Sequence, residues 1–344
     1  FLLFFNFRHI IFWCTGAGFY LFPILIINNE LMKLFLKRVQ LFLLFSALFF
    51  GALTSAFFVY YDLSIDDVPA PYLSSNFHYN EKLRFIRNSE IKPDIIYAGS
   101  SIALANFHSD TMTEKLGTDA HLNFSSQGLT LEHFIPLLSI QATIHRPQTL
   151  IFATNIYEFS NRHILFSYDL IEDYLCADDN PIQYYLKRFN LQYFMEHFPR
   201  IRNIRLRSDD RFELSYDRHG SVNITHIGTP EDRYWNRTFL ESDINYRYDN
   251  LKELADFASS NNIKLIVVQT PIRSELLDNL SSEDKNRRKQ HIEEIRNIIA
   301  NHGFSFIDSN TVFWEDILFA NGTHLNVYGA KKFSEFIFEE LNSQ

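Results

Sequence analysis

The sequence contains few of the residues from which covalent or metal-based scaffolds are built. Only two cysteines occur among its 344 residues, Cys14 and Cys176, and they lie far apart. A disulfide framework or a cysteine-rich metal centre needs more thiols at closer spacing. We therefore expect neither of these, and no cofactor and no bound metal.

Basic residues are outnumbered by acidic ones. The chain contains 32 Lys and Arg and 41 Asp and Glu, which gives a net charge of −9. This acidic balance argues against a nucleic-acid backbone as partner. Internal repeats and low-complexity tracts are absent from the sequence. A chain of this length with 46% hydrophobic residues can bury one large core, or one core plus a sizeable insertion.

The amino-terminal part of the chain is apolar and predicts a membrane anchor. The 21 residues from Leu41 to Tyr61 contain no charged side chain, which is long enough to cross a hydrocarbon core of roughly 30 Å. Three basic residues precede this run between positions 33 and 38, and three aspartates follow between positions 62 and 67. We expect a transmembrane signal anchor at 32–61, with the basic flank in the cytoplasm and the rest of the chain outside.

A cleavable signal peptide is the alternative, because Thr54-Ser55-Ala56 is a passable cleavage site. The apolar run continues past that site to Tyr61, which favours an anchor. A second apolar stretch, Ile10 to Ile27, precedes Met32, the first methionine of the sequence. Residues 1–31 are therefore either upstream sequence or the tail of a fragment.

Beyond the anchor, residues 62–90 are predicted to form a linker and a leading helix. From residue 91 to residue 344 the pattern is that of an α/β domain, interrupted by a loosely patterned insertion of helices and loops at about 156–245. Short apolar runs alternate with segments of helical spacing, which indicates a doubly wound parallel sheet. The strands are expected at 94–98, 120–124, 149–154, 263–269 and 304–308, and the helices at 77–88, 101–116, 131–144, 248–259, 282–300 and 327–341.

The most informative stretch of this domain is PDIIYAGSSIALANF, Pro93 to Phe107. Its pattern predicts a strand, then a turn at Gly99-Ser100-Ser101, then the start of a helix. Such a junction exposes a serine hydroxyl at the carboxyl end of a parallel strand, beside helix N–H groups that can hold an oxyanion. The alternative is that Gly99 makes a tight turn and the serines cap the helix.

Two other strand ends and one loop carry groups suited to the same chemistry. The second strand is followed by Gly128, the third ends at Asn155, and His324 lies in a loop before the last helix. Acyl transfer needs a hydroxyl nucleophile, an imidazole and oxyanion donors. Each residue also has a structural explanation, as a turn glycine, a strand-end cap or a surface histidine. Their placement at successive strand ends favours a common site.

Together these blocks resemble the SGNH (GDSL-like) hydrolase superfamily, and in particular its membrane-anchored relatives that act on cell-envelope glycans. Ser100 departs from the usual Gly-Asp-Ser, whereas the block from His324 to Asn326 with Gly329 matches well. The resemblance implies a flavodoxin-like three-layer fold, Ser101 as nucleophile and His324 as its base. It also implies an oxyanion hole made by the N–H of Ser101, Gly128 and Asn155.

The acid of the expected triad is the point of departure from the family. Its usual place, three residues before the histidine, holds Asn321. Our candidate for a replacement is Asp308, because it ends the last strand at the edge of the sheet where Ser101 lies, and Asp316 is the second candidate. The alternative for Asp308 is a cap on the following turn.

These observations predict an extracytoplasmic, membrane-anchored serine esterase or O-acyltransferase that acts on acyl groups of a cell-envelope polysaccharide. The expected partners are an acylated glycan, the membrane and, for a transferase, a membrane protein that donates the acyl group. The alternative is a non-catalytic glycan-binding or assembly protein on the same fold.

Overall fold

The computed structural model describes residues 29–60, 68–160, 163–176, 182–206, 214–232, 234–236 and 246–343. The chain divides into two compact units, residues 1–66 and residues 67–344. The expectations for residues 1–28, for the start of the linker and for part of the insertion lie outside the described residues.

The described part of the first unit, residues 29–60, is a helix, α1 (Asn29–Tyr60). Within it, Met32–Ala56 is long and apolar enough to cross a membrane, and none of its most apolar window is buried. A signal sequence meets the same criteria. The helix begins well before the uncharged run because Leu, Met and Lys between positions 31 and 40 are also good helix formers.

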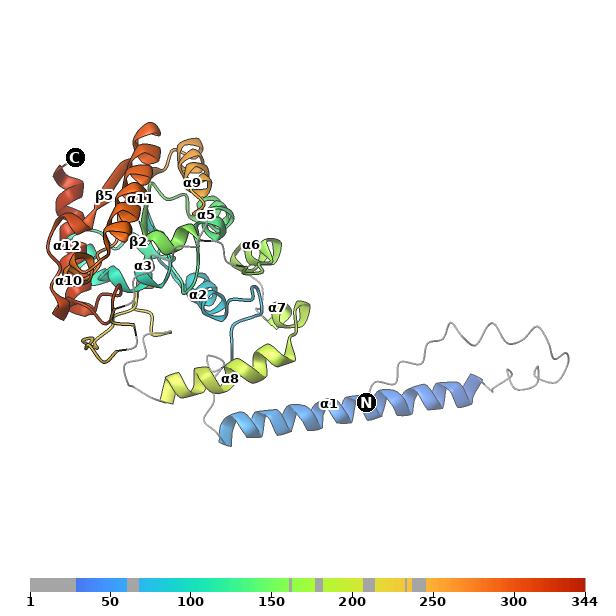
Figure 1. Cartoon of the computed structure of the whole chain (residues 1–344). Coiled ribbons are helices and arrows are strands. Elements are labelled where there is room, and N and C mark those ends of the chain that lie inside the picture. The colour runs from blue at the N-terminus through green and yellow to red at the C-terminus, as the bar shows by residue number, and fades with distance from the viewer. Residues whose placement is uncertain are drawn as a thin grey trace, which may run out of the picture. The chain divides into compact units, whose positions relative to one another are not determined.

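The second unit is built on five parallel strands in the order β2-β1-β3-β4-β5. This order is that of a flavodoxin-like doubly wound sheet, as expected. The strands are nearly continuous apolar runs because helices cover both faces (Figure 1). Their bounds are β1 Ile95–Ala98, β2 His121–Asn123, β3 Thr149–Thr154, β4 Lys264–Gln269 and β5 Ser305–Asp308.

The two faces of the sheet bury different sets of alternating strand residues, and each set packs against its own helices. On β3, Leu150 and Phe152 face one layer, whereas Ile151 and Ala153 face the other. The first layer contains α2 (Phe77–Asn88), α5 (Leu131–His145), α6 (Tyr168–Cys176), α9 (Asp249–Ser260) and α11 (Ser282–Asn301). The second contains α3 (Ser101–Asn106), α4 (Ser109–Leu116) and α12 (Val327–Ser343).

The single helix expected at 101–116 is two helices in the structure. Phe107 separates α3 from α4 and is fully buried. His108 then caps α4, because its ring Nδ1 accepts a hydrogen bond from the Thr111 N–H at 3.3 Å. A buried aromatic and a histidine cap thus break a pattern whose spacing alone predicts one helix.

The segment predicted as a polar linker is packed into the domain from residue 69 onward. The Ala70 N–H donates to the Glu81 carboxylate at 2.6 Å, and the Ser74 N–H donates to Asn80 Oδ1 at 2.8 Å. Leu73 is buried in the main core. Polar side chains on α2 therefore hold this backbone in place, and a polar composition does not make it a linker.

The insertion contains helices and loops, as expected. Its elements are the 3-10 turn η2 (Ile156–Phe159), α6, α7 (Ile182–Lys187) and α8 (Leu191–Leu206). Ile171 and Tyr174 of α6 belong to the main core, so this part of the insertion is integral to the domain. The short elements α10 (Ser274–Asp278), η3 (Ser309–Thr311) and η4 (Asp316–Leu318) follow β4 and β5.

Candidate active site

The turn after β1 leaves no room for a side chain at Gly99. Its φ is +154°, and an added Cβ would lie 2.4 Å from both the Cβ of Ala103 and the carbonyl oxygen of Ala153. Only glycine fits this backbone without displacing β3. The tight turn places Ser101 at the first position of α3, at the carboxyl edge of the sheet.

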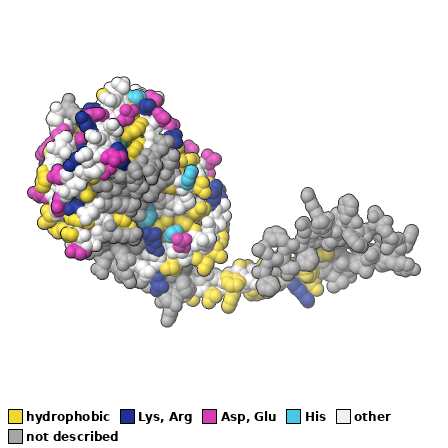
Figure 2. Space-filling view, viewed as in Figure 1, with side chains coloured by type: hydrophobic (Ala, Val, Ile, Leu, Met, Phe, Trp, Pro, Cys, Tyr) yellow, Lys and Arg dark blue, Asp and Glu magenta, His cyan; other side chains and the backbone are white. Residues whose placement is uncertain are grey.

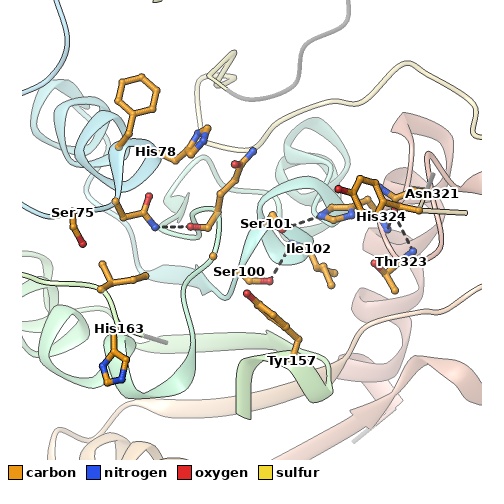
Figure 3. A pocket seen from close by; sticks show the side chains of 16 residues that line it. Ser75, His78, Ser100, Ser101, Ile102, Tyr157, His163, Asn321, Thr323 and His324 are labelled. Carbon is orange, nitrogen blue, oxygen red and sulfur yellow. Dashed lines mark hydrogen bonds between the residues drawn. The ribbon is translucent and has the colours of Figure 1, made fainter. Parts of the chain in front are cut away.

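The two neighbouring serines have different surroundings (Figure 3). Ser100 is buried, and its hydroxyl donates to the Glu158 carboxylate while accepting from the Ile102 N–H at 3.3 Å. It is a helix cap. The Ser101 hydroxyl instead faces the pocket and lies 2.9 Å from Nε2 of His324. The structure therefore brings the predicted pair, Ser101 and His324, into contact.

Hydrogen bonds at Asn321 determine which ring nitrogen of His324 carries the proton. Asn321 Oδ1 accepts from the N–H groups of Thr323 and His324 at 3.1 and 3.0 Å, which identifies it as the amide oxygen. The same oxygen lies 3.1 Å from the ring Nδ1. Because an amide oxygen can only accept, Nδ1 is protonated and donates to it. Nε2 is therefore the acceptor for the Ser101 hydroxyl, as a general base requires.

Burial lowers the pKa of His324 to about 4, so the imidazole is neutral at pH 7. Asn321 orients the ring and selects its tautomer, but an amide carries no charge to stabilise the imidazolium that proton transfer creates. The site thus has the geometry of a Ser-His pair with a neutral third member.

The histidine loop is fixed to its neighbours by side-chain amides. Asn106, at the end of α3, accepts from the Leu325 N–H at 3.1 Å, which ties the loop to the serine-bearing helix. Asn326 donates to Ile317 and caps α12 through the Gly329 N–H at 3.1 Å. The fully buried Asn106 was not predicted as a site residue; its one sequence signal is its place at the end of the predicted strand-turn-helix stretch.

The insertion also holds this loop, through backbone hydrogen bonds. The Gly228 N–H donates to the Phe319 carbonyl at 2.9 Å, and the Val327 N–H donates to the Ile224 carbonyl at 2.7 Å. The loop that carries His324 is therefore braced on one side by α3 and on the other by the insertion.

Asn155 has a buried amide nitrogen with an unmet hydrogen-bonding capacity. Its Oδ1 accepts from the Tyr157 N–H at 2.7 Å, whereas its Nδ2 has no hydrogen-bond partner in the described part of the chain. A buried donor without a partner is costly in a folded protein. Gly128, with φ +75°, lines the same pocket as Ser101. These are the properties that oxyanion donors need.

Glu158 is a site residue that sequence reasoning missed. One carboxylate oxygen accepts from the Asn155 N–H at 2.8 Å and the other from the Ser100 hydroxyl. It therefore links the nucleophile turn to the end of β3. Burial raises the pKa of Glu158 to about 7. The available signal was the Asn-x-x-Glu spacing directly after a strand, which is a capping-box pattern.

The structure corrects the prediction that Asp308 is the partner of His324. Strand β5 lies three strand intervals from β1, which is roughly 14 Å. The Asp308 carboxylate instead accepts from the Asn310 N–H at 3.0 Å and lies 3.5 Å from Arg288. The second candidate, Asp316, is paired with Arg273. Asn321 is the residue at Nδ1.

The serine and the histidine open into a cavity of about 700 Å³. Its wall combines the start of α2, the loop after β2, the insertion and the histidine loop (Figure 3). The lining residues are Ser75, Asn76, Phe77, His78, Ser100, Ser101, Ile102, Gln127, Gly128, Tyr157, His163, Ile164, Tyr234, Asn321, Thr323 and His324. Within the described ranges, no group of three or more His, Cys, Asp or Glu side chains is placed to hold a metal ion.

Comparison with known proteins finds no matching family model and no matching curated protein. Among solved structures, the chain is similar to a lipase/acylhydrolase from Enterococcus faecalis, with 12% identity over 72% of this chain and 95% of that chain and a TM-score of 0.38. It is also similar to an acetylxylan esterase from Geobacillus stearothermophilus, with 10% identity, 72% and 93% coverage and a TM-score of 0.38. A psychrotrophic esterase from a Pseudoalteromonas species has 9% identity, 72% and 96% coverage and a TM-score of 0.34.

The domain is a flavodoxin-like, doubly wound α/β fold. Its strand order and the four residue blocks at the carboxyl edge of its sheet resemble those of the SGNH hydrolases. The chain differs from that family's usual pattern at Ser100 and at Asn321. Ser100 is a cap held by Glu158, and Asn321 is the amide that orients His324.

Proposed function

We propose that the protein is a serine esterase or O-acyltransferase whose nucleophile is Ser101. The observation that carries this proposal is the 2.9 Å contact between the Ser101 hydroxyl and Nε2 of His324, in the tautomer in which Nε2 is the hydrogen-bond acceptor. The amide nitrogen of Asn155, for which the described residues provide no hydrogen-bond partner, supports it.

In this mechanism the Ser101 oxygen attacks the ester carbonyl while its proton passes to Nε2 of His324. The N–H groups of Ser101 and Gly128 and the Asn155 amide stabilise the oxyanion. The alcohol then leaves with the proton from His324, and an acyl-enzyme remains. Water or a sugar hydroxyl, deprotonated by His324, next attacks the acyl group and releases the enzyme.

For the substrate, we propose acyl groups on a cell-envelope polysaccharide. The cavity combines aromatic side chains at Phe77, Tyr157 and Tyr234 with amide and hydroxyl groups. Aromatic faces pack well against sugar rings, while the polar groups match their hydroxyls. Two acceptors are possible for the same acyl-enzyme, so incubation with an acetylated polysaccharide distinguishes them: an esterase releases free acetate, and a transferase yields a newly acetylated glycan.

For the location, we propose that α1 anchors the protein and that the α/β domain lies outside the cytoplasm. The three basic residues before the uncharged run support this orientation. A reporter that is active only outside the cytoplasm, fused to the carboxyl terminus, is expected to be active. Activity from a cytoplasm-dependent reporter alone would reverse the topology.

A fluorophosphonate probe tests the nucleophile in the full-length protein. We expect one covalent adduct on Ser101, no adduct in Ser101→Ala, and unchanged labelling in Ser75→Ala, a serine elsewhere in the same cavity. Full labelling of Ser101→Ala would disprove the assignment. If the wild-type protein binds glycans but neither reacts with the probe nor cleaves acetyl esters, the non-catalytic alternative is correct.

A further inference from the structure

The helices α7 and α8 leave large apolar side chains in solvent. The exposed residues recur at a spacing of four on each helix, at Ile182 and Leu186 and at Leu191 and Met195, so each pair lies on one face. Together with Phe189 between the helices, all five are more than half exposed. Figure 2 shows hydrophobic side chains gathered at the edge of the domain where α7 and the start of α8 lie. We call these five residues the α7–α8 surface.

The same region is basic within an acidic domain. Residues 182–203 contain four Lys or Arg and one Glu, for a net charge of +3. Residues 62–344 contain 28 basic and 40 acidic residues, for a net charge of −12. Arg188 and Lys187, both exposed, immediately precede the α8 part of the surface, and the Lys187 ammonium lies 3.6 Å from the Asp173 carboxylate of α6. Apolar side chains beside basic ones are the composition of a helix that lies in the headgroup region of an anionic bilayer.

Helix α8 also packs on the segment by which the chain enters the domain. The ring of Tyr193 lies 5.1 Å from that of Tyr72, and its hydroxyl accepts from Asn80 at 3.1 Å. A few residues earlier, the Val68 carbonyl accepts from Arg84 at 2.6 Å. Seven residues separate Val68 from Tyr60, the end of α1, and the eight Cα–Cα steps across them span at most roughly 30 Å. A membrane that holds α1 is therefore within reach of the part of the domain to which α8 belongs.

We propose that the α7–α8 surface docks on the anionic lipid headgroups of the membrane in which α1 is anchored. This inference rests on the proposed anchoring. The apolar residues enter the boundary between headgroups and acyl chains, and the basic residues contact lipid phosphates. A lipid surface accounts for both features, since a protein partner of this acidic domain would have to supply the anionic groups itself.

Docking has a consequence for the substrate cavity. Phe77 stacks on His197 of α8 at 4.1 Å, and Phe77 and His78 line the cavity. The cavity wall thus contacts α8, the helix that carries Leu191 and Met195 of the surface. A docked α8 brings the cavity close to the headgroups, so the substrate it reaches is an acyl group or glycan held at the membrane.

The test uses the full chain in lipid nanodiscs that contain phosphatidylglycerol. An environment-sensitive fluorophore is attached at Met195→Cys or, as the control, at Lys289→Cys on α11, which is 75% exposed. Both variants also carry Cys14→Ser and Cys176→Ser. We expect lipid-borne spin labels to quench position 195 at least twofold more strongly than position 289. Aqueous iodide is expected to quench position 289 more strongly.

A second variant checks that apolar contact causes the signal. Adding Leu186→Gln and Leu191→Gln is expected to reduce lipid quenching at position 195 at least twofold without lowering the melting temperature, because both side chains are exposed. Equal quenching at positions 195 and 289 in a chain that is inserted in the nanodisc would overturn docking alone. Failure to insert would overturn anchoring and docking together. Protection of position 195 that appears only when a second copy or another protein is added would identify a protein interface and overturn the lipid proposal.

Discussion

The carboxyl edge of the sheet has two halves that differ in what their polar side chains bind. Behind β1 and β3, the Ser101 hydroxyl faces an imidazole across an open cavity, and the Asn155 amide nitrogen has no partner among the described residues. Behind β4 and β5, Arg273 donates to both oxygens of Asp316 at 2.9 and 2.7 Å, and Asp308 is bound by Asn310. Polar residues on one edge therefore need not form one site.

The half that can do chemistry is the one whose hydroxyl and imidazole open into a cavity. Arg273 is buried, and its Nη1 donates to the Trp235 carbonyl at 2.8 Å, so its charge is used to hold loops together. In contrast, the β1–β3 half keeps the Ser101 nucleophile and the His324 base beside a cavity that a substrate can fill. Four substitutions or measurements test this difference.

The largest effect is expected at Asn155. Asn155→Ala removes an oxyanion donor, so kcat on an acetyl ester should fall about 10²- to 10³-fold with a small change in KM. The matched control is Asn310→Ala at the β5 end, which should leave kcat within about twofold. Steady-state kinetics of the two variants measure this. Equal losses in both would remove the distinction between the halves.

A smaller, opposite effect is expected at Asn321. Asn321→Asp places a carboxylate at Nδ1 of His324, which stabilises the imidazolium, so kcat/KM should rise on the order of tenfold. In a serine protease on an unrelated fold, the reverse exchange lowers turnover about ten-thousand-fold. Asp308→Asn should change kcat/KM less than twofold. A large loss of kcat/KM in Asp308→Asn would show that Asp308 is the carboxylate partner of His324 and would contradict the geometry described above.

The pH dependence follows from the depressed pKa of His324. The neutral imidazole is the active base, and burial lowers its pKa from 6.5 to about 4. The acid limb of kcat/KM, which reports the free enzyme, should therefore lie near pH 4 and activity should persist at pH 5.5. In Asn321→Asp the limb should move to higher pH, because a carboxylate favours the charged ring. A wild-type midpoint at 6.5 would show that His324 is not desolvated.

The smallest effect is on stability and concerns Glu158. Burial raises its pKa from 4.5 to about 7, so folding favours the protonated form. The stability that protonated Glu158 gives the folded state is fully present below pH 4.5 and is lost as the pH rises through 7. Between pH 5 and 8 the unfolding free energy should fall by roughly 1 to 3 kcal/mol more in the wild type than in Glu158→Gln. Urea titrations measure this, and parallel curves would contradict it.

The sequence predicted the sheet well because its strands are short, buried and bounded by turn residues. Thr149–Thr154 matches its expected bounds, and the first strand begins one residue later than expected. The meeting of Ser101 and His324 was also predictable, since both follow from residue blocks at strand ends. The position of Asp308 relative to His324 was not predictable. It depends on the order of the strands in space, and that order does not appear in local patterns.

Glu158, Asn106 and the packed segment after Val68 were missed for a related reason. Each acts through hydrogen bonds to backbone or side chains far away in the sequence, such as Asn106 to Leu325. Polar residues in these roles have the composition of caps and linkers, and only tertiary contacts distinguish them. Local pattern therefore identifies where the chemistry is, and long-range pairing identifies what holds it in place.

The backbone bonds from Gly228 to Phe319 and from Val327 to Ile224 have a consequence for protein engineering. A minimal enzyme made by deleting the insertion would keep the sheet and Ser101 but lose one of the two braces of the loop that carries His324. Trimming or exchanging the insertion to alter substrate preference therefore alters the position of the general base as well. Specificity and turnover in this protein cannot be redesigned independently unless the contacts made by residues 224 and 228 are retained.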